Sequence, residues 1–277
     1  MEKGLRSAIE GSGFTFKKKF GQNFISDGAL LNRIVDGAGV TADDTVIEIG
    51  CGAGALTKAL AARAKYVYGY EIDLSLRPVL ERTLSGVDNV EIIFRDFLRV
   101  RLDELEKSLP AYKVVANLPY YITTPLIMSL VENSKRCLSM TVMVQEEVAL
   151  RLCARPDTPD YGAITANVAL RGECKIIERV DRRFFTPSPN VDSAVVRVDL
   201  TESRLDVSDT DLYKKVVRAA FSSRRKTLEN NLISAFSLSR AEAGAVIEGV
   251  GLSRGVRGET LSPQDFARLA NALGKRQ

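Results

Sequence analysis

A glycine-rich turn placed directly after an apolar run is the first feature of this sequence that could bind a ligand. Val46-Ile47-Glu48-Ile49 reads as a buried strand, and Gly50-Cys51-Gly52-Ala53-Gly54 follows it and opens a helical pattern. Glycines are needed in such a turn because a side chain would keep the backbone away from a ligand and would clash at the tight bend. Dinucleotide-binding proteins and purely structural turns share this pattern, so the surrounding residues decide the ligand.

Two carboxylates at later strand ends supply that context. Glu71 closes the second expected strand about 20 residues after the glycines, where an acid can accept hydrogen bonds from both hydroxyls of a ribose. Asp96 follows the third expected strand and is suited to the exocyclic amine of an adenine. Dinucleotide enzymes share the first acid but seldom carry the second at a strand end. The pair therefore favours S-adenosylmethionine over NAD as cofactor.

The fourth expected strand ends in Asn117-Leu118-Pro119-Tyr120, and Phe185-x-Pro187-x-Pro189-x-Val191-x-Ser193 follows further along the chain. The first motif resembles the active-site motif of methyltransferases that act on amino groups of nucleic-acid bases. Together, the two motifs resemble the ribosomal RNA adenine dimethyltransferase family, and most closely its housekeeping small-subunit branch. Residues 20–24 resemble the family's cofactor-capping motif, and residues 221–228 resemble the basic helix of its C-terminal domain. The resemblance spans residues 17 to about 232.

This resemblance implies methyl transfer to the N6 atom of adenosines in ribosomal RNA, and the residue types at the motifs suit that reaction. Adenine N6 is a poor nucleophile because its lone pair is delocalised into the ring, and the base must leave a duplex to be reached. The Asn117 side-chain carbonyl and the Leu118 backbone carbonyl would accept the N6 hydrogens and localise that lone pair. Pro119 would stiffen the loop, while Tyr120 and Phe185 would stack on the base. Phe184 is expected in the core instead.

The expected site residues, taken from the family resemblance and, for Lys17, Lys18 and Lys19, from a basic run near the N-terminus, fall into two groups. The expected cofactor contacts are Gln22, Asn23, Ile25, Gly50, Gly52, Glu71, Asp96 and Asn117. The expected RNA contacts are Lys17, Lys18, Lys19, Arg224, Arg225 and Lys226. No metal site is expected, since the chain has no histidine and its cysteines, Cys51, Cys137, Cys153 and Cys174, form no C-x-x-C pair.

The elements that must position these residues alternate between short apolar strands and helices from residue 44 to about 145, a pattern typical of βαβ units. Two extended runs, 175–180 and 194–200, are expected to form an antiparallel hairpin. After residue 200 the periodicity is helical, and Ser262-Pro263-Gln264-Asp265 looks like the start of a last helix. The predicted fold is α/β: a Rossmann-like methyltransferase sheet, parallel with a C-terminal antiparallel hairpin, plus a small all-α C-terminal domain.

Composition and charge agree with a two-domain protein that binds RNA. The 277 residues are 45% hydrophobic and 27% charged, with no apolar run near the roughly 20 residues of a membrane span and no export signal. A soluble, cytoplasmic protein is therefore expected, and a monomer is expected because nothing in the sequence demands a larger assembly. Residues 1–206, the predicted methyltransferase domain, carry 27 basic against 28 acidic side chains, whereas the helical domain, 207–277, carries 12 against 7. This positive charge could grip a polyanion, although a solvated face would carry the same charge.

Three functions remain open. The leading hypothesis is dimethylation of two adjacent adenosines in the 3′-terminal hairpin of 16S ribosomal RNA, within the immature small subunit. An enzyme of the same chemistry that acts on 23S RNA and confers macrolide resistance is the second. The third is a non-catalytic assembly or nucleic-acid-binding factor on the same fold, which would show erosion of Asn117, Tyr120 or the cofactor acids; none is eroded.

Overall fold

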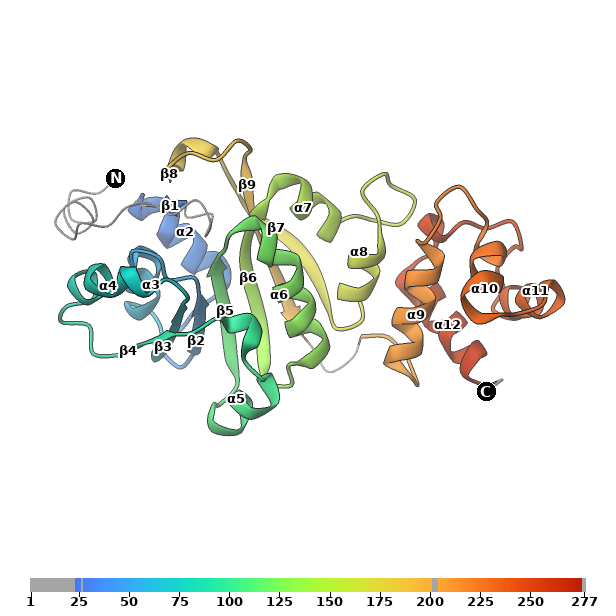
Figure 1. Ribbon diagram of the computed structural model, residues 1–277, viewed down its shortest axis with the longest axis horizontal. Coiled ribbons are helices and arrows are strands. Elements are labelled where there is room, and N and C mark those ends of the chain that lie inside the picture. Colours follow the sequence, from blue (N-terminus) through green and yellow to red (C-terminus); the bar gives the residue numbers. More distant parts are fainter. Residues whose placement is uncertain (1–22, 26, 201–203, 276–277) are drawn as a thin grey trace. The chain divides into compact units, whose positions relative to one another are not determined.

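The chain divides into two compact units in the computed structural model (Figure 1), which describes residues 23–25, 27–200 and 204–275. Unit 1 comprises Met1–Ala149 and Cys174–Leu200, and unit 2 comprises Leu150–Glu173 and Thr201–Gln277. The predicted contacts Lys17, Lys18, Lys19 and Gln22 lie outside the described residues.

A seven-stranded sheet forms the centre of unit 1, in the order β4-β3-β2-β5-β6-β9-β7. The pairs β2–β3, β2–β5, β3–β4 and β5–β6 are parallel, whereas β9 runs antiparallel to β6. This arrangement confirms the predicted Rossmann-like sheet, which is parallel from β4 to β6, and β7 and β9, the two expected hairpin strands, lie side by side with β9 antiparallel to β6. The strands are β2 (Thr45–Ile49), β3 (Tyr66–Glu71), β4 (Val90–Phe94), β5 (Tyr112–Asn117), β6 (Cys137–Gln145), β7 (Gly172–Val180) and β9 (Ser193–Leu200).

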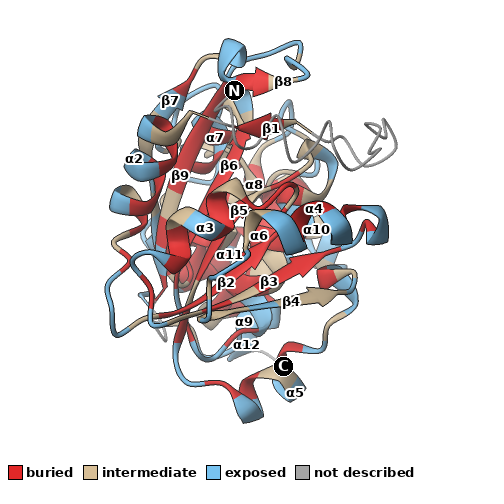
Figure 2. Ribbon diagram, turned by 90° about the vertical axis from the view of Figure 1, so that its left-hand side faces the viewer, coloured by how far each residue is buried: buried red, intermediate tan, exposed pale blue. Residues whose placement is uncertain are grey.

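Helices cover both faces of this sheet, so its central strands are mostly apolar and buried. All five residues of β2 are buried, whereas the edge strand β4 is only partly covered, as the colours of Figure 2 show. On one face, α2 packs on α3, β6 and β9, and its Leu30, Ile34 and Val35 join Val46 and Val115 of the strands in one core cluster. The helices of unit 1 are α2 (Gly28–Ala38), α3 (Ala55–Ala61), α4 (Arg77–Thr83), α5 (Leu102–Ser108) and α6 (Tyr120–Asn133), and α7 (Glu146–Leu152) leads into unit 2.

A second, two-stranded sheet joins segments that lie far apart in the sequence. β1 (Phe24–Ile25) pairs antiparallel with β8 (Phe185–Thr186), so that Phe24 faces Thr186 and Ile25 faces Phe185. The expected cofactor cap and the expected base-stacking residue are therefore neighbours. No pattern in the sequence predicted this pairing, because each strand is only two residues long.

Unit 2 is a helical bundle with its own core. Its helices are α8 (Ala163–Val168), α9 (Thr210–Ala220), α10 (Leu228–Phe236), α11 (Arg240–Gly249) and α12 (Pro263–Gly274). The last of these begins as predicted: Ser262 and Asp265 cap each other's backbone amides, with Pro263 at the first helical position. Buried aromatic residues tie the bundle together, since the Tyr213 hydroxyl donates to the Ala166 carbonyl at 2.8 Å and the Tyr161 hydroxyl donates to the Leu261 carbonyl at 2.9 Å.

The boundary between the units differs from the predicted division at residues 206 and 207. Residues 150–173 belong to unit 2, because Tyr161, Ala166 and Leu170 are buried in the core formed by the C-terminal helices. Within the described ranges, no helix is both long and apolar enough to cross a membrane.

Candidate active site

One cavity of 280 Å³ opens at the carboxyl ends of β2, β3 and β5, where ligands bind in open α/β sheets. Every cofactor or catalytic residue predicted from the sequence and described by the structure lines it. These residues are Asn23, Ile25, Gly50, Gly52, Glu71, Asp96, Asn117, Leu118, Pro119, Tyr120 and Phe185.

The glycine turn between β2 and α3 adopts a backbone that only glycine takes readily. Gly50 and Gly52 have φ values of +81° and +54°, both in the left-handed region. A Cβ atom on Gly52 would lie 2.8 Å from a ring carbon of Phe24, so the N-terminal strand closes over this glycine. The turn is thus shaped by two requirements, its left-handed backbone and the close approach of β1.

Glu71 connects the end of β3 to the glycine turn. Its Oε2 accepts a hydrogen bond from the Gly52 amide at 2.9 Å, and its Oε1 accepts from the Ile72 and Asp73 amides, each at 2.8 Å. Burial raises the pKa of this carboxyl group, and the three amides oppose that rise. The carboxylate oxygens still have lone pairs to offer, because a carboxylate accepts about four hydrogen bonds.

Glu48 is a buried carboxyl group on β2 that the sequence reasoning did not single out. Its side chain is fully buried against the cavity, and no described residue forms a hydrogen bond with either of its oxygens, although Thr57 and Cys51 are its polar neighbours. Burial raises the pKa of Glu48 to about 7; Thr57 and Cys51 oppose this rise, and the nearby Glu71 adds to it to a smaller extent. The signal in the sequence was a single acid inside an otherwise apolar strand.

Asp96 stands at the start of the short helix η3 (Phe97–Arg99), on the strand end next to Glu71. Its Oδ1 accepts from the Leu98 amide at 3.1 Å, and its Oδ2 lies 3.5 Å from the exposed Arg99 guanidinium. A solvated pair of this kind holds the carboxylate only weakly. The second oxygen is therefore available to a ligand.

Two apolar side chains beside these acids were missed from the sequence. Ile72 directly follows Glu71 and is 50% exposed, and Leu98 lies two residues after Asp96 and is 41% exposed. Both line the cavity, where apolar groups next to polar ones suit the faces of a planar base. The signal that could have found them is an apolar residue just after each strand-end acid.

The Asn117 loop is held by contacts from other parts of unit 1. The Asn117 Nδ2 atom donates to the Asn23 carbonyl at 3.3 Å, which leaves Oδ1 as the acceptor of this amide. None of the described residues donates a hydrogen bond to the Leu118 carbonyl. Two oxygens at the end of β5 are therefore available to accept hydrogen bonds from a ligand amine.

Tyr120 begins α6, and a hydrogen bond at the hydroxyl end of its side chain fixes the ring. Its hydroxyl lies 2.9 Å from the Ser193 hydroxyl at the start of β9, and burial raises its pKa. Ser193 is the last residue of the proline-rich motif and is 1% exposed. This contact explains why the motif ends in serine, a role that the sequence did not reveal.

Of the two neighbouring phenylalanines, the one expected in the core is exposed, and the other is buried. Phe184 was expected in the core, but it is 38% exposed, whereas Phe185 is 4% exposed. The reason is the β1–β8 pairing, which turns Phe185 toward Ile25 and the apolar cluster beneath it. Phe185 still lines the cavity, so its predicted place beside the base pocket stands.

In unit 2, Arg224, Arg225 and Lys226 are all exposed, but they lie in the loop between α9 and α10 and not on a helix as expected. Arg224 is partly used within the protein: its guanidinium donates to the Tyr161 carbonyl at 2.8 Å and to the Pro159 carbonyl at 3.3 Å. The expected helix was wrong at these positions because Thr227 is the N-cap of α10: its hydroxyl accepts a hydrogen bond from the Asn230 amide, so the helix begins only after the three basic residues.

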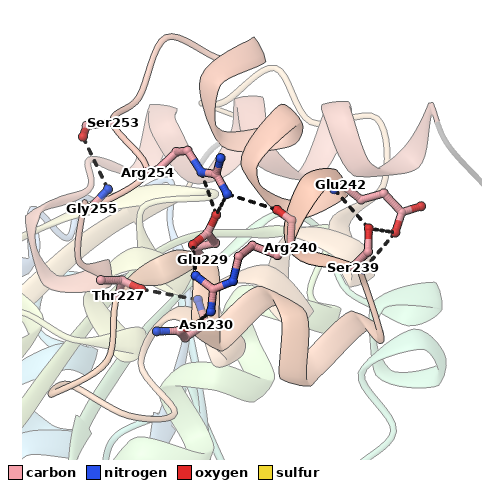
Figure 3. Close-up of polar contacts among 9 residues, drawn as sticks. All are labelled: Thr227, Glu229, Asn230, Ser239, Arg240, Glu242, Ser253, Arg254 and Gly255. Atoms are coloured by element: carbon pink, nitrogen blue, oxygen red, sulfur yellow. Dashed lines mark hydrogen bonds and ion pairs between the residues drawn. The ribbon is translucent and has the colours of Figure 1, made fainter.

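A buried carboxylate stabilises the helix that follows this loop. Glu229, whose side chain is 7% exposed, lies between two guanidinium groups (Figure 3). Arg240 approaches its Oε2 at 3.1 Å, and the Arg254 Nε donates to its Oε1 at 2.7 Å. These ion pairs join α10 to the start of α11 and to the segment after α11.

Comparison with known proteins gives one consistent result. The family model described as "Ribosomal RNA adenine dimethylase" matches residues 13–275. A relative named "Ribosomal RNA small subunit methyltransferase A" from Geobacillus thermodenitrificans is 45% identical over 269 residues, which cover 94% of this chain and 92% of the relative. One of the same name from Streptococcus thermophilus is 44% identical over 276 residues, covering 97% and 95%.

Solved structures agree with the fold. A dimethyladenosine transferase from Plasmodium falciparum superposes with a TM-score of 0.79 at 26% identity, covering 91% of this chain and 98% of that one. The 23S rRNA methyltransferase ErmE superposes with a TM-score of 0.71 at 29% identity, covering 91% and 100%.

Proposed function

This chain belongs to the ribosomal RNA adenine dimethylase family, and from that membership we propose that it dimethylates N6 of two adjacent adenosines in the 3′-terminal hairpin of 16S ribosomal RNA. The reaction takes place during late assembly of the small subunit, in the cytoplasm, with the protein acting as a monomer. The observation that carries the proposal is the single cavity in which the glycine turn, the two strand-end acids and the Asn117 loop meet.

S-adenosylmethionine fits the donor side of this cavity. The left-handed Gly50 and Gly52 allow a ligand to approach the backbone, Glu71 offers lone pairs to ribose hydroxyls, and Asp96 offers one oxygen to an adenine amine. Ile72 and Leu98 present apolar surface to the faces of that adenine. When bound, the cofactor supplies an electrophilic methyl group on a sulfonium.

The acceptor side suits an exocyclic amine. The Asn117 Oδ1 and the Leu118 carbonyl accept the two N6 hydrogens, which draws the nitrogen toward tetrahedral geometry and localises its lone pair for attack. Attack on the methyl group would break its bond to the sulfonium, which would leave as the neutral thioether of S-adenosylhomocysteine. The amine would become cationic and lose its proton to water afterwards, so the site needs no strong base. Positioning and fixed dipoles therefore supply the rate.

The extruded base is held by stacking once it has left the base stack of the RNA. The Tyr120 ring, fixed through its hydroxyl to Ser193, supports one face of the adenine, and Phe185 closes the other. Stacking on an aromatic side chain contributes about 1 to 3 kcal/mol per base, which helps to offset the cost of extrusion.

RNA docking involves the positively charged unit 2. Arg225 and Lys226 are exposed and contact phosphates without reading bases, while Arg224 also holds residues 159–161 in place. Lys17, Lys18 and Lys19 extend the same charge to the N-terminal side of the chain.

The test is direct. The protein is incubated with tritium-labelled S-adenosylmethionine and small subunits that lack the modification, and the labelled nucleotide is mapped. We expect up to four methyl groups per RNA on two adjacent adenosines. Label in 23S RNA instead would overturn the target assignment.

A 23S target is the second candidate, favoured only by the likeness to ErmE. The relatives named for the small subunit are far more similar in sequence, so this candidate ranks lower. It predicts that expression of the protein raises the erythromycin tolerance of the host, and unchanged tolerance argues against it.

A role in subunit assembly apart from catalysis is compatible with the first candidate. An Asn117→Ala variant is expected to lose methylation. If this variant binds immature subunits with normal affinity, the two roles are separable.

A further inference from the structure

Tyr121 is an exposed aromatic side chain at the mouth of the base pocket, with no role in the reaction described above. It follows Tyr120 at the start of α6, it lines the same cavity, and it is 65% exposed. Tyr120, by contrast, is partly buried and bound through its hydroxyl to Ser193. The two neighbouring rings therefore differ in what they can contact.

An exposed aromatic ring at the mouth of a base pocket offers a π-face that a base can cover, because covering apolar area contributes binding free energy and every base can stack on such a ring. Ile72 and Leu98 are also exposed at this cavity, but they adjoin the acids of the cofactor side. Tyr121 instead continues the Asn117 loop, on the side of the acceptor amine.

Resting on the proposed function, we propose that the Tyr121 ring stacks on the base of the nucleotide next to the extruded adenosine. When a base leaves a stack, its neighbour loses one stacking partner, and an exposed ring beside the pocket replaces that partner. Because the two target adenosines are adjacent, one of the two neighbours of an extruded target is the other target, and the proposal assigns the Tyr121 ring to this one. Tyr121 thereby binds the second adenosine while the first is in the pocket.

The test combines protein variants with altered RNA. Small subunits are reconstituted with 16S RNA whose 3′ hairpin is joined by splint ligation and carries either both adenosines or one adenosine and one abasic nucleotide. On the intact RNA, Tyr121→Ala is expected to lower kcat/KM by about 5- to 150-fold, mainly through KM for the subunit. Tyr121→Phe is expected to retain wild-type activity, because it keeps the ring.

On the two single-abasic RNAs, the difference between wild type and Tyr121→Ala is expected to vanish for at least one position, since the stacking partner is gone. Leu138→Ala, which truncates another exposed apolar residue of unit 1, serves as the matched control. It is expected to leave kcat/KM unchanged on the intact RNA and on the abasic RNAs. Thermal unfolding of each variant reports on folding.

Three outcomes overturn the inference. The first is an unchanged kcat/KM for Tyr121→Ala on intact RNA. The second is a loss of kcat/KM for Tyr121→Ala on both abasic RNAs that is as large as on intact RNA, and the third is a loss in Tyr121→Phe as large as in Tyr121→Ala. These outcomes are distinct from failure of the proposed function, in which the wild-type protein itself transfers no methyl group to the intact hairpin.

Discussion

Replacing Glu48 by glutamine is expected to stabilise the protein above neutral pH. The native carboxyl group is fully buried, and no described residue hydrogen-bonds to its oxygens. Burial raises its pKa from the ordinary value of 4.5 to about 7. Each unit of difference between the native and unfolded pKa corresponds to about 1.4 kcal/mol. The free energy of unfolding is therefore lower by about 3 kcal/mol above the native pKa, where the buried group must ionise.

The direction of the pH dependence follows from proton binding. Between pH 4.5 and about 7, native Glu48 keeps its proton while the same residue in the unfolded chain has lost it. The unfolded state then binds fewer protons, so the free energy of unfolding falls as pH rises through this interval and stays low above it. Glutamine resembles protonated glutamate in shape and is neutral at every pH, so it escapes this loss.

Urea denaturation followed by circular dichroism at pH 5, 6, 7 and 8 measures the effect. We expect Glu48→Gln to exceed wild type by less than about 1 kcal/mol at pH 5 and by about 3 kcal/mol at pH 8. Parallel stability profiles for the two proteins across this range would refute the argument, because they would mean that the native carboxyl group ionises as readily as an exposed one.

Glu106→Gln is a control of opposite sign. Burial of Glu106 disfavours its charge, but donors from Ser134, Lys135 and Tyr112 outweigh burial and lower its pKa. Its stabilising contribution is therefore present above pH 4.5 and is lost as pH falls through the native pKa. The glutamine variant is expected to be less stable than wild type at pH 8, and this deficit should shrink on acidification.

Three further variants test the site and the RNA surface. Ser193→Ala is expected to lower kcat/KM about two- to tenfold by removing the hydrogen bond that fixes Tyr120, and adding Tyr120→Phe should cause no further loss if the two side chains act together. Asp96→Ala is expected to raise the Kd for S-adenosylhomocysteine about tenfold or more in calorimetry, and an unchanged Kd would remove this acid from the cofactor site. The double variant Arg225→Ala and Lys226→Ala is expected to reduce the slope of log binding constant against log salt by about 1.4 to 1.8 in filter binding to small subunits, whereas an unchanged slope would exclude both from the phosphate contacts.

Local patterns in the sequence were enough to predict the sheet and the polar strand-end residues of the cavity. Apolar runs bounded by Gly, Pro, Asn and Asp specify parallel strands, and residues that end such strands meet at one edge of the sheet. For that reason Gly50, Glu71, Asp96 and Asn117, which are spread over nearly 70 positions, line one cavity as predicted. The start of the last helix was equally local, since Ser262 and Asp265, three residues apart, cap each other's backbone amides.

Other features were decided only by tertiary structure, because they depend on partners far along the chain. Phe184 and Phe185 have the same side chain, and only the pairing of β8 with β1 buries the second of them. Residues 150–173 join unit 2 because Tyr161 finds its hydrogen-bond acceptor 100 positions later, at Leu261.

The buried Glu48 shows the same division between local and distant causes. The sequence determines that an acid stands inside an apolar strand, but only the helices and strands packed around it exclude water and raise its pKa. Secondary structure follows from short-range backbone and side-chain preferences. Burial and electrostatic environment are set by whichever residues the fold brings together, and the spacing of the sequence does not contain that information.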